Sequence, residues 1–275
     1  MHPSLSQKNI IGVGLRQPHF DFFLNNPNKV DFLEIHSENF FSKNPAATKL
    51  LTNISKNYHL SMHSIGLSLG SPERPCPKHL KKLKNLITQF QPILVSDHIS
   101  WSKYQNHFFN DLLPIPYTKE SLANIVDNIK YTQDFLGRNI LVENPSNYIN
   151  FKNNDFHEWD FINQTAELSK CAILLDINNI FVSCANNKID PYKYLKQLNH
   201  EYVREIHLAG PKLTKINEIE IYIDTHNNPV LDEVWRLYEF YLKNYGPKPT
   251  LIEWDQDIPA IETLLDLAAK AKSMH

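Results

Sequence analysis

The chain has 275 residues, and its 28 lysine and arginine residues against 30 aspartate and glutamate residues give a formal charge of −2 with histidine neutral. This near balance argues against a partner that is nucleic acid or an acidic membrane surface. Hydrophobic residues make up 42% of the chain, which excludes intrinsic disorder for most of it. The apolar runs are far shorter than the ~20 residues of a membrane helix. Residues 1–9 carry no signal-peptide pattern, and the three cysteines form no CxxC pair, so we expect a cytoplasmic protein.

Short apolar runs recur along the whole chain, and most are followed by a helix-like stretch. Residues 78–91 and 119–136 carry apolar side chains three and four positions apart, which is typical of amphipathic helices, and 259–272 begin with a proline suited to a first helical turn. The eight runs are residues 10–15, 30–36, 59–63, 93–98, 140–144, 173–176, 203–208 and 250–255. Eight alternations of strand and helix predict an α/β protein with a TIM-like (β/α)₈ barrel, and a doubly wound open sheet is the alternative.

The chain contains no proline- or serine-rich linker, so we expect a single domain over residues 1–275. The seventh unit is unusually long and predicts an insertion at about residues 211–228. Within it, the alternating segment 219–228 ends in an Asn pair and indicates a small ribbon over the barrel mouth.

Polar residues gather at the carboxyl ends of the runs, where barrel enzymes build their active sites. A single histidine or aspartate there is more often a hydrogen-bonded core residue or a helix cap. Many of them in one buried pocket would cost several kcal/mol per unpaired charge, so a bound cation explains the cluster better. The candidate metal ligands are His63, His98, Glu143, Asp176, His207, Asp224, His226 and Glu253.

Imidazole and carboxylate donors without thiolate suit Fe, Mn or Zn. These residues exceed what one ion can use, so two or three ions with a bridging carboxylate are expected. Asp224 and His226 are two positions apart, and an extended segment would direct both to one face. The alternative for this pair is a turn aspartate beside a surface histidine.

Further polar residues at the same ends are candidates for supporting the ligands or contacting substrate. Glu34 and His36 also share a strand face, which a satisfied polar network would explain equally well. No complete glycine-rich phosphate loop and no GxSxG motif is present. This second set comprises Arg16, Glu34, His36, Asn144, Asn178 and Asp255.

Nine sequence blocks, in order from about residue 10 to 268, closely resemble the DUF692 (UPF0276-like) family of multinuclear non-haem iron-dependent oxidative enzymes. They are GVGLR at 12–16, EIHSEN at 34–39, MHSIGLSLG at 62–70, SDHISW at 96–101, NDLLP at 110–114, VENPS at 142–146, LDINN at 175–179, HLAG at 207–210 and LIEWD at 251–255.

The resemblance implies a TIM-like barrel in which the eight candidate ligands, with Asn144 near them, hold two or three iron ions. It implies oxygen-dependent modification, commonly of cysteine, in a ribosomally synthesised precursor peptide, and a companion protein that recognises this peptide. Pro211 departs from the family pattern, which often has histidine at that position. The alternative function is that of a Mn- or Zn-dependent barrel isomerase or of an endonuclease IV-like hydrolase.

Overall fold

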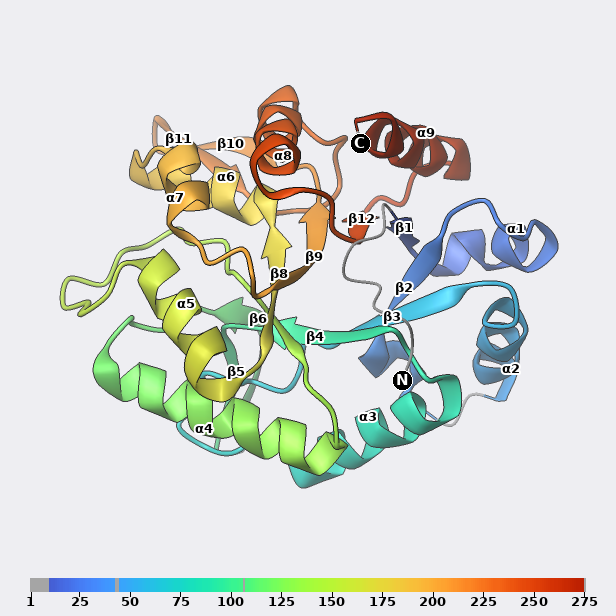
Figure 1. Ribbon diagram of the computed structural model, residues 1–275, viewed down its shortest axis with the longest axis horizontal. Helices are drawn as coiled ribbons and strands as arrows, with labels where there is room; N and C mark the ends of the chain where they lie inside the picture. Colours follow the sequence, from blue (N-terminus) through green and yellow to red (C-terminus); the bar gives the residue numbers. More distant parts are fainter. Residues whose placement is uncertain (1–9, 43–44, 106, 275) are drawn as a thin grey trace.

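Eight parallel strands close into a barrel in the computed structural model, which describes residues 10–42, 45–105 and 107–274 (Figure 1). The order around the barrel is β1-β12-β9-β8-β7-β4-β3-β2. Each barrel strand therefore lies beside the barrel strands that precede and follow it in the chain, and β12 closes the barrel against β1. Each predicted run supplies one strand, which confirms the barrel and excludes the open sheet. The barrel strands are β1 (Ile11–Gly14), β2 (Phe32–His36), β3 (His59–His63), β4 (Leu94–His98), β7 (Leu141–Glu143), β8 (Ala172–Asp176), β9 (Val203–Leu208) and β12 (Thr250–Ile252). Residues 1–9, on which the targeting expectation rests, lie outside the described ranges.

Helices surround the barrel (Figure 1). Their apolar side chains belong to the hydrophobic core together with those of the strands. Leu80 and Leu83 in α3 and Ile125 and Ile129 in α4 are fully buried, as the predicted helix patterns require. The α-helices are α1 (Phe20–Asn25), α2 (Pro45–Ile54), α3 (Pro77–Phe90), α4 (Lys119–Leu136), α5 (Glu158–Ser169), α6 (Ile177–Asn187), α7 (Pro191–Gln197), α8 (Asp232–Tyr245) and α9 (Ile261–Ser273), and two 3₁₀ turns are η2 (Gln17–His19) and η3 (Ser37–Phe40). None of the helices within these ranges is long and apolar enough to cross a membrane.

The last helix starts later than its proline suggested. Ala260 has an extended ψ of 146°, so α9 begins at Ile261 and Pro259 precedes it. The Pro259 carbonyl oxygen instead lies 2.9 Å from His19 Nε2. The prediction that Pro259 occupies the first turn is therefore wrong.

Two antiparallel hairpins are inserted after barrel strands. β10 (Lys212–Ile216) and β11 (Ile219–Ile223) follow β9 and form a ribbon within the predicted insertion. Only β11 falls in the predicted segment 219–228, and the turn lies at residues 217–218 instead of at the Asn pair, because residues 212–216 supply the partner strand. β5 (Trp101–Tyr104) and β6 (His107–Leu113) follow β4 and were not predicted. Six of the seven β6 residues are exposed, so β6 buries no face and its sequence lacks the alternation that marks a strand.

Gly12 leaves room for the ring of Phe32 on the neighbouring strand β2. A Cβ atom at this position would lie 2.7 Å from the ring of Phe32, which is fully buried on β2. The glycine therefore serves packing inside the barrel wall, in keeping with its assignment to a strand instead of a phosphate loop.

Candidate metal centre

The carboxyl ends of the barrel strands surround a pocket of about 240 Å³. Six of the eight candidate ligands line it, namely His63, His98, Glu143, Asp224, His226 and Glu253. Asp176 and His207 are fully buried beside them. The barrel thus brings together candidate ligands that are up to 190 residues apart in the chain, from His63 to Glu253.

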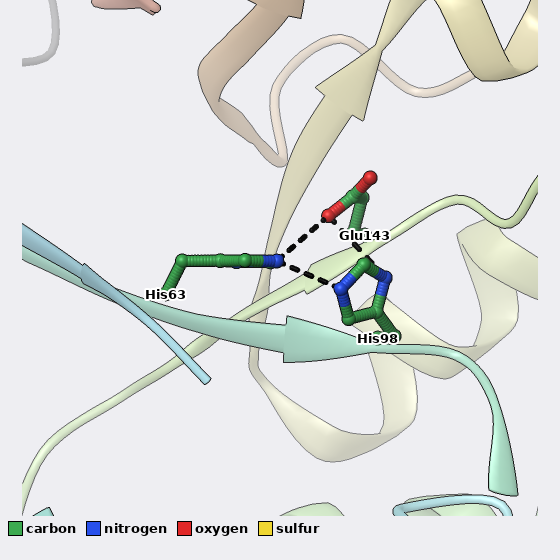
Figure 2. Close-up of side chains that lie close together, drawn as sticks. All are labelled: His63, His98 and Glu143. Atoms are coloured by element: carbon green, nitrogen blue, oxygen red, sulfur yellow. Dashed lines mark hydrogen bonds and ion pairs between the residues drawn. The ribbon is translucent and has the colours of Figure 1, made fainter. Parts of the chain in front are cut away.

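The first group of donors comprises His63, His98 and Glu143, which point toward one another from β3, β4 and β7 (Figure 2). The His63 and His98 Nε2 atoms are 2.7 Å apart. Glu143 Oε2 lies 3.3 Å from His63 Nε2 and 3.4 Å from His98 Nδ1. Ser96 Oγ contacts His63 Nδ1 at 2.7 Å, which fixes the imidazole orientation.

Two further groups continue from the first, each sharing a carboxylate with the group before it. Glu143, Asp176 and His207 form one, and Asp176, His226 and Glu253 form the next, with ligand atoms within 4.8 Å of one another in each group. Glu143 thus belongs to two groups and Asp176 to two. A carboxylate common to adjacent groups is what a bridged multinuclear site needs.

The donor atoms fit metal ions on two observations. Glu143 Oε2 and Asp176 Oδ2 are buried and make no hydrogen bond within the described part of the chain, and such acceptors are costly unless a cation neutralises them. The donors are imidazole nitrogens and carboxylate oxygens, and no cysteine belongs to these groups, which suits Fe, Mn or Zn.

Burial sets the protonation states of the first group. It lowers the pKa of His98 to about 4 and holds the pKa of His63 well below its ordinary value, so both imidazoles are neutral at pH 7. Burial raises the pKa of Glu143 well above its ordinary value, and that of Asp176 to about 7. The metal-free cluster therefore retains protons that bound cations would displace.

The pKa of Glu253 shifts in the opposite direction from those of Glu143 and Asp176. Burial alone would raise its pKa, but His226 and His207 hold it well below the ordinary value. The His207 Nδ1 atom is 3.0 Å from Glu253 Oε2, and the His226 Nδ1 atom is 3.4 Å from it. Glu253 is thus a carboxylate that joins two imidazoles.

Asp224 and His226 meet through a turn and not through an extended strand. The pair follows β11, and His226 has a φ of +47°, in the left-handed region. His226 Nε2 then lies 2.6 Å from Asp224 Oδ1. The extended-segment geometry was therefore wrong although both side chains line the pocket, and no three-residue donor group in the described residues includes Asp224.

Three asparagines hydrogen-bond to the candidate ligands. Asn144 accepts from the Asp176 backbone N–H at 2.8 Å, and Asn178 Nδ2 donates to Asp224 Oδ1 at 2.7 Å. Asn179 Nδ2 donates to Glu143 Oε1 at 2.9 Å, while its backbone N–H donates to Asp176 Oδ1 at 2.6 Å. Asn144 and Asn178 were predicted from the sequence, whereas Asn179, the next residue in the first turn of α6, was missed.

Arg16, His36 and Asp255 form a cation-containing network at the edge of the pocket. The Arg16 guanidinium pairs with Asp255, and its Nη2 lies 3.0 Å from His36 Nε2. Asp255 has a lowered pKa because Arg16, His226 and His36 outweigh the effects of burial and of Glu253. His36, Glu253 and Asp255 form a further possible donor group, with ligand atoms within 4.8 Å of one another, but Arg16 already supplies positive charge to Asp255.

Glu34 and Glu205 are fully buried inside the barrel. Glu34 Oε2 accepts from Ser61 Oγ at 3.0 Å and lies 3.5 Å from His207 Nε2. Burial and the nearby Glu34 raise the pKa of Glu205 to about 8. Glu205 was not among the predicted residues because it lies in mid-strand, and its same-face spacing from His207 was the available indication.

Comparison with protein families gives a match over most of the chain. The model of the family described as RiPP precursor modification enzyme MbnB/TglH/ChrH matches residues 10–275. A UPF0276 protein of Vibrio parahaemolyticus is 48% identical over 262 residues, covering 95% of this chain and 91% of the relative. A UPF0276 protein of Chromobacterium violaceum is 40% identical over 266 residues, covering 96% and 94%.

Solved structures with the same fold are distant in sequence. Endonuclease IV from Thermus thermophilus has a TM-score of 0.63 at 12% identity, with 97% of this chain and 100% of that chain covered. D-psicose 3-epimerase from Clostridium cellulolyticum has a TM-score of 0.56 at 11% identity, with 96% of each chain covered. At these identities the similarity concerns the barrel fold alone.

Proposed function

Because the chain belongs to the MbnB/TglH/ChrH family of RiPP precursor modification enzymes, we propose that it is an iron-dependent enzyme that uses dioxygen to modify a residue, commonly cysteine, of a ribosomally made peptide. The observation that carries the proposal is the set of adjacent donor groups that share Glu143 and Asp176. Two or three iron ions would occupy these groups.

Each donor group has a role in holding metal. His63 and His98 present neutral imidazoles, and Glu143 links their group to Asp176 and His207. Asn179 holds Glu143 in place by donating to its other carboxylate oxygen. When bound, iron supplies electron transfer between dioxygen and a substrate thiol.

The walls of the pocket suit a peptide side chain that must be kept from bulk water. Ile65, Leu112, Leu113 and Pro114 line the pocket together with its polar side chains. Apolar side chains in the wall exclude water and strengthen the electrostatic interactions of the polar side chains. A companion protein that recognises the rest of the peptide belongs to the same proposal.

The test is an oxygen-dependent change in peptide mass. Iron-loaded protein is incubated with each short cysteine-containing peptide encoded beside its gene, with and without dioxygen, and intact masses are measured. His98→Ala removes a donor and should abolish the change. His59→Ala, an exposed histidine at the opposite end of β3 from His63, should preserve it. Unchanged masses for every peptide, or full activity of His98→Ala, would contradict the proposal.

The same nitrogen and oxygen donors also suit Mn or Zn. Full occupancy by either metal, which iron cannot displace, would indicate isomerase or hydrolase chemistry instead. The metal content is therefore measured together with the peptide masses.

A further inference from the structure

The metal pocket is too small for a peptide. Its volume of about 240 Å³ is below the ~300–1,000 Å³ of sites that enclose a small molecule. Under the proposed function, on which this inference rests, one side chain enters the pocket and the flanking peptide lies on the rim.

One part of that rim is a strand. Leu112 and Leu113 at the end of β6 line the pocket, and the strand runs outward from them to His107. The side chains of Phe109 and Leu112 are 44% and 37% exposed. β6 therefore presents exposed apolar side chains that continue directly into the metal pocket.

The outer edges of two hairpin strands are already covered. On β5, the backbone N–H groups of Ser102 and Lys103 donate to Ser68 Oγ at 2.9 and 3.1 Å. On β11, Tyr222 exchanges two 2.9 Å hydrogen bonds with the Asn186 side chain of α6. These contacts occupy the positions where an added strand would pair.

The remaining edges belong to β6 and β10, each of which pairs with one strand within residues 10–42, 45–105 and 107–274. β10 carries exposed Lys212 and Lys215 and does not line the pocket. Edge lysines are a common protection against strand addition, and β6 has none.

A bulge interrupts the pairing of β5 with β6. The ladder pairs Lys103 with Phe108 and Trp101 with Leu113, so residues 109–112 lie opposite Ser102 alone. The Leu112 N–H donates to Asp111 Oδ1 at 2.8 Å. Bulges next to active sites re-aim a strand, and here the bulge adjoins the pocket.

We propose that the outer edge of β6 binds an extended segment of the peptide substrate as an added strand, through backbone hydrogen bonds and contacts to Phe109 and Leu112. The added strand directs the next residue of the peptide into the metal pocket. This mode gives affinity from the backbone and tolerates varied side chains.

Hydrogen–deuterium exchange tests the binding site directly. The probe is the peptide acetyl-Thr-Val-Cys-Val-Thr-Val-amide at millimolar concentration, kept reduced, with metal-free and iron-loaded protein. Amides of residues 107–113 should exchange more slowly by about tenfold, whereas residues 212–216 of β10 should be unchanged. The same peptide with N-methylated valines, which cannot donate to a ladder, should give no protection.

Substitutions separate β6 from the other open edge. Phe109→Lys should weaken the binding of the probe about tenfold, and Leu112→Lys provides an independent variant because Phe109 also packs on Trp101. Ile216→Lys is the matched control, since Ile216 is 52% exposed on β10, and it should leave binding within about twofold. Folding of each variant is checked by circular dichroism.

The outcomes distinguish this inference from the proposed function. Protection of β6 in protein that shows no iron-dependent chemistry would support strand addition while the function failed. No protection of residues 107–113, protection of β10 instead, or equal binding by the N-methylated probe would overturn strand addition even if the enzyme proved oxidative.

Discussion

Asp176 makes the metal-free protein less stable as the pH rises. Burial raises its pKa from the ordinary 3.8 to about 7, with His226 opposing and Asp224 and Glu253 adding to the rise. Between these pH values the folded protein keeps a proton that the unfolded chain has lost. The free energy of unfolding therefore falls through this window, and the loss is complete above about pH 7.

The size of the effect follows from the shift. About three pKa units at ~1.36 kcal/mol each give a destabilisation of about 4 kcal/mol at pH 8. Asp176→Asn removes the ionisation and keeps the cap, because the amide oxygen can still accept from the Asn179 N–H. Its NH₂ group replaces Oδ2, which is buried without a donor near the Glu143 carboxylate. We expect Asp176→Asn to stabilise the metal-free protein by about 2–4 kcal/mol at pH 8.

Urea unfolding in the presence of EDTA measures this at pH 8 and pH 5. The gain should be smaller at pH 5. This pH lies nearer the ordinary pKa of 3.8, so the metal-free protein has lost less of its free energy of unfolding there. Asp134→Asn, an exposed carboxylate on α4, is the control and should be neutral at both pH values. Destabilisation by Asp176→Asn at pH 8, or a gain independent of pH, would refute the reasoning.

Three further substitutions test the elements that support the site. Asn179→Ala removes the donor to Glu143 and should cost about 1–3 kcal/mol and weaken metal binding about tenfold or more, measured by denaturation and by metal titration; unchanged affinity would contradict the positioning role. Asn186→Ala removes both hydrogen bonds that hold Tyr222 of β11, so elemental analysis should show reduced total metal, and full occupancy would show that the hairpin needs no anchor. Thr118→Ala removes the α4 cap and should lower stability by about 1 kcal/mol in thermal unfolding without altering metal content; a loss of metal would mean that this helix end affects the site.

The barrel could be predicted from sequence because parallel strands buried on both faces appear as continuous apolar runs. His63, His98 and Glu143 followed from the same pattern, since each lies at the carboxyl end of such a run. The amphipathic helices α3 and α4 were equally visible, because one face of each packs on the barrel.

The residues that sequence reasoning missed lack that periodic information. β6 buries almost nothing, so no alternation marks it. Asn179 acts from a helix turn, and its contact with Glu143 depends on how α6 sits over β7. The left-handed conformation of His226 depends on how the chain returns from β11, which local spacing does not encode.

The central claim is that the shared donor groups hold more than one iron ion. The most direct measurement is elemental analysis of protein purified anaerobically from iron-supplemented cells, combined with Mössbauer spectra of an iron-57 sample before and after exposure to oxygen. Two or three irons per chain whose valence changes with oxygen are predicted. Stoichiometric zinc or manganese that iron cannot replace, or a single iron indifferent to oxygen, would contradict the account.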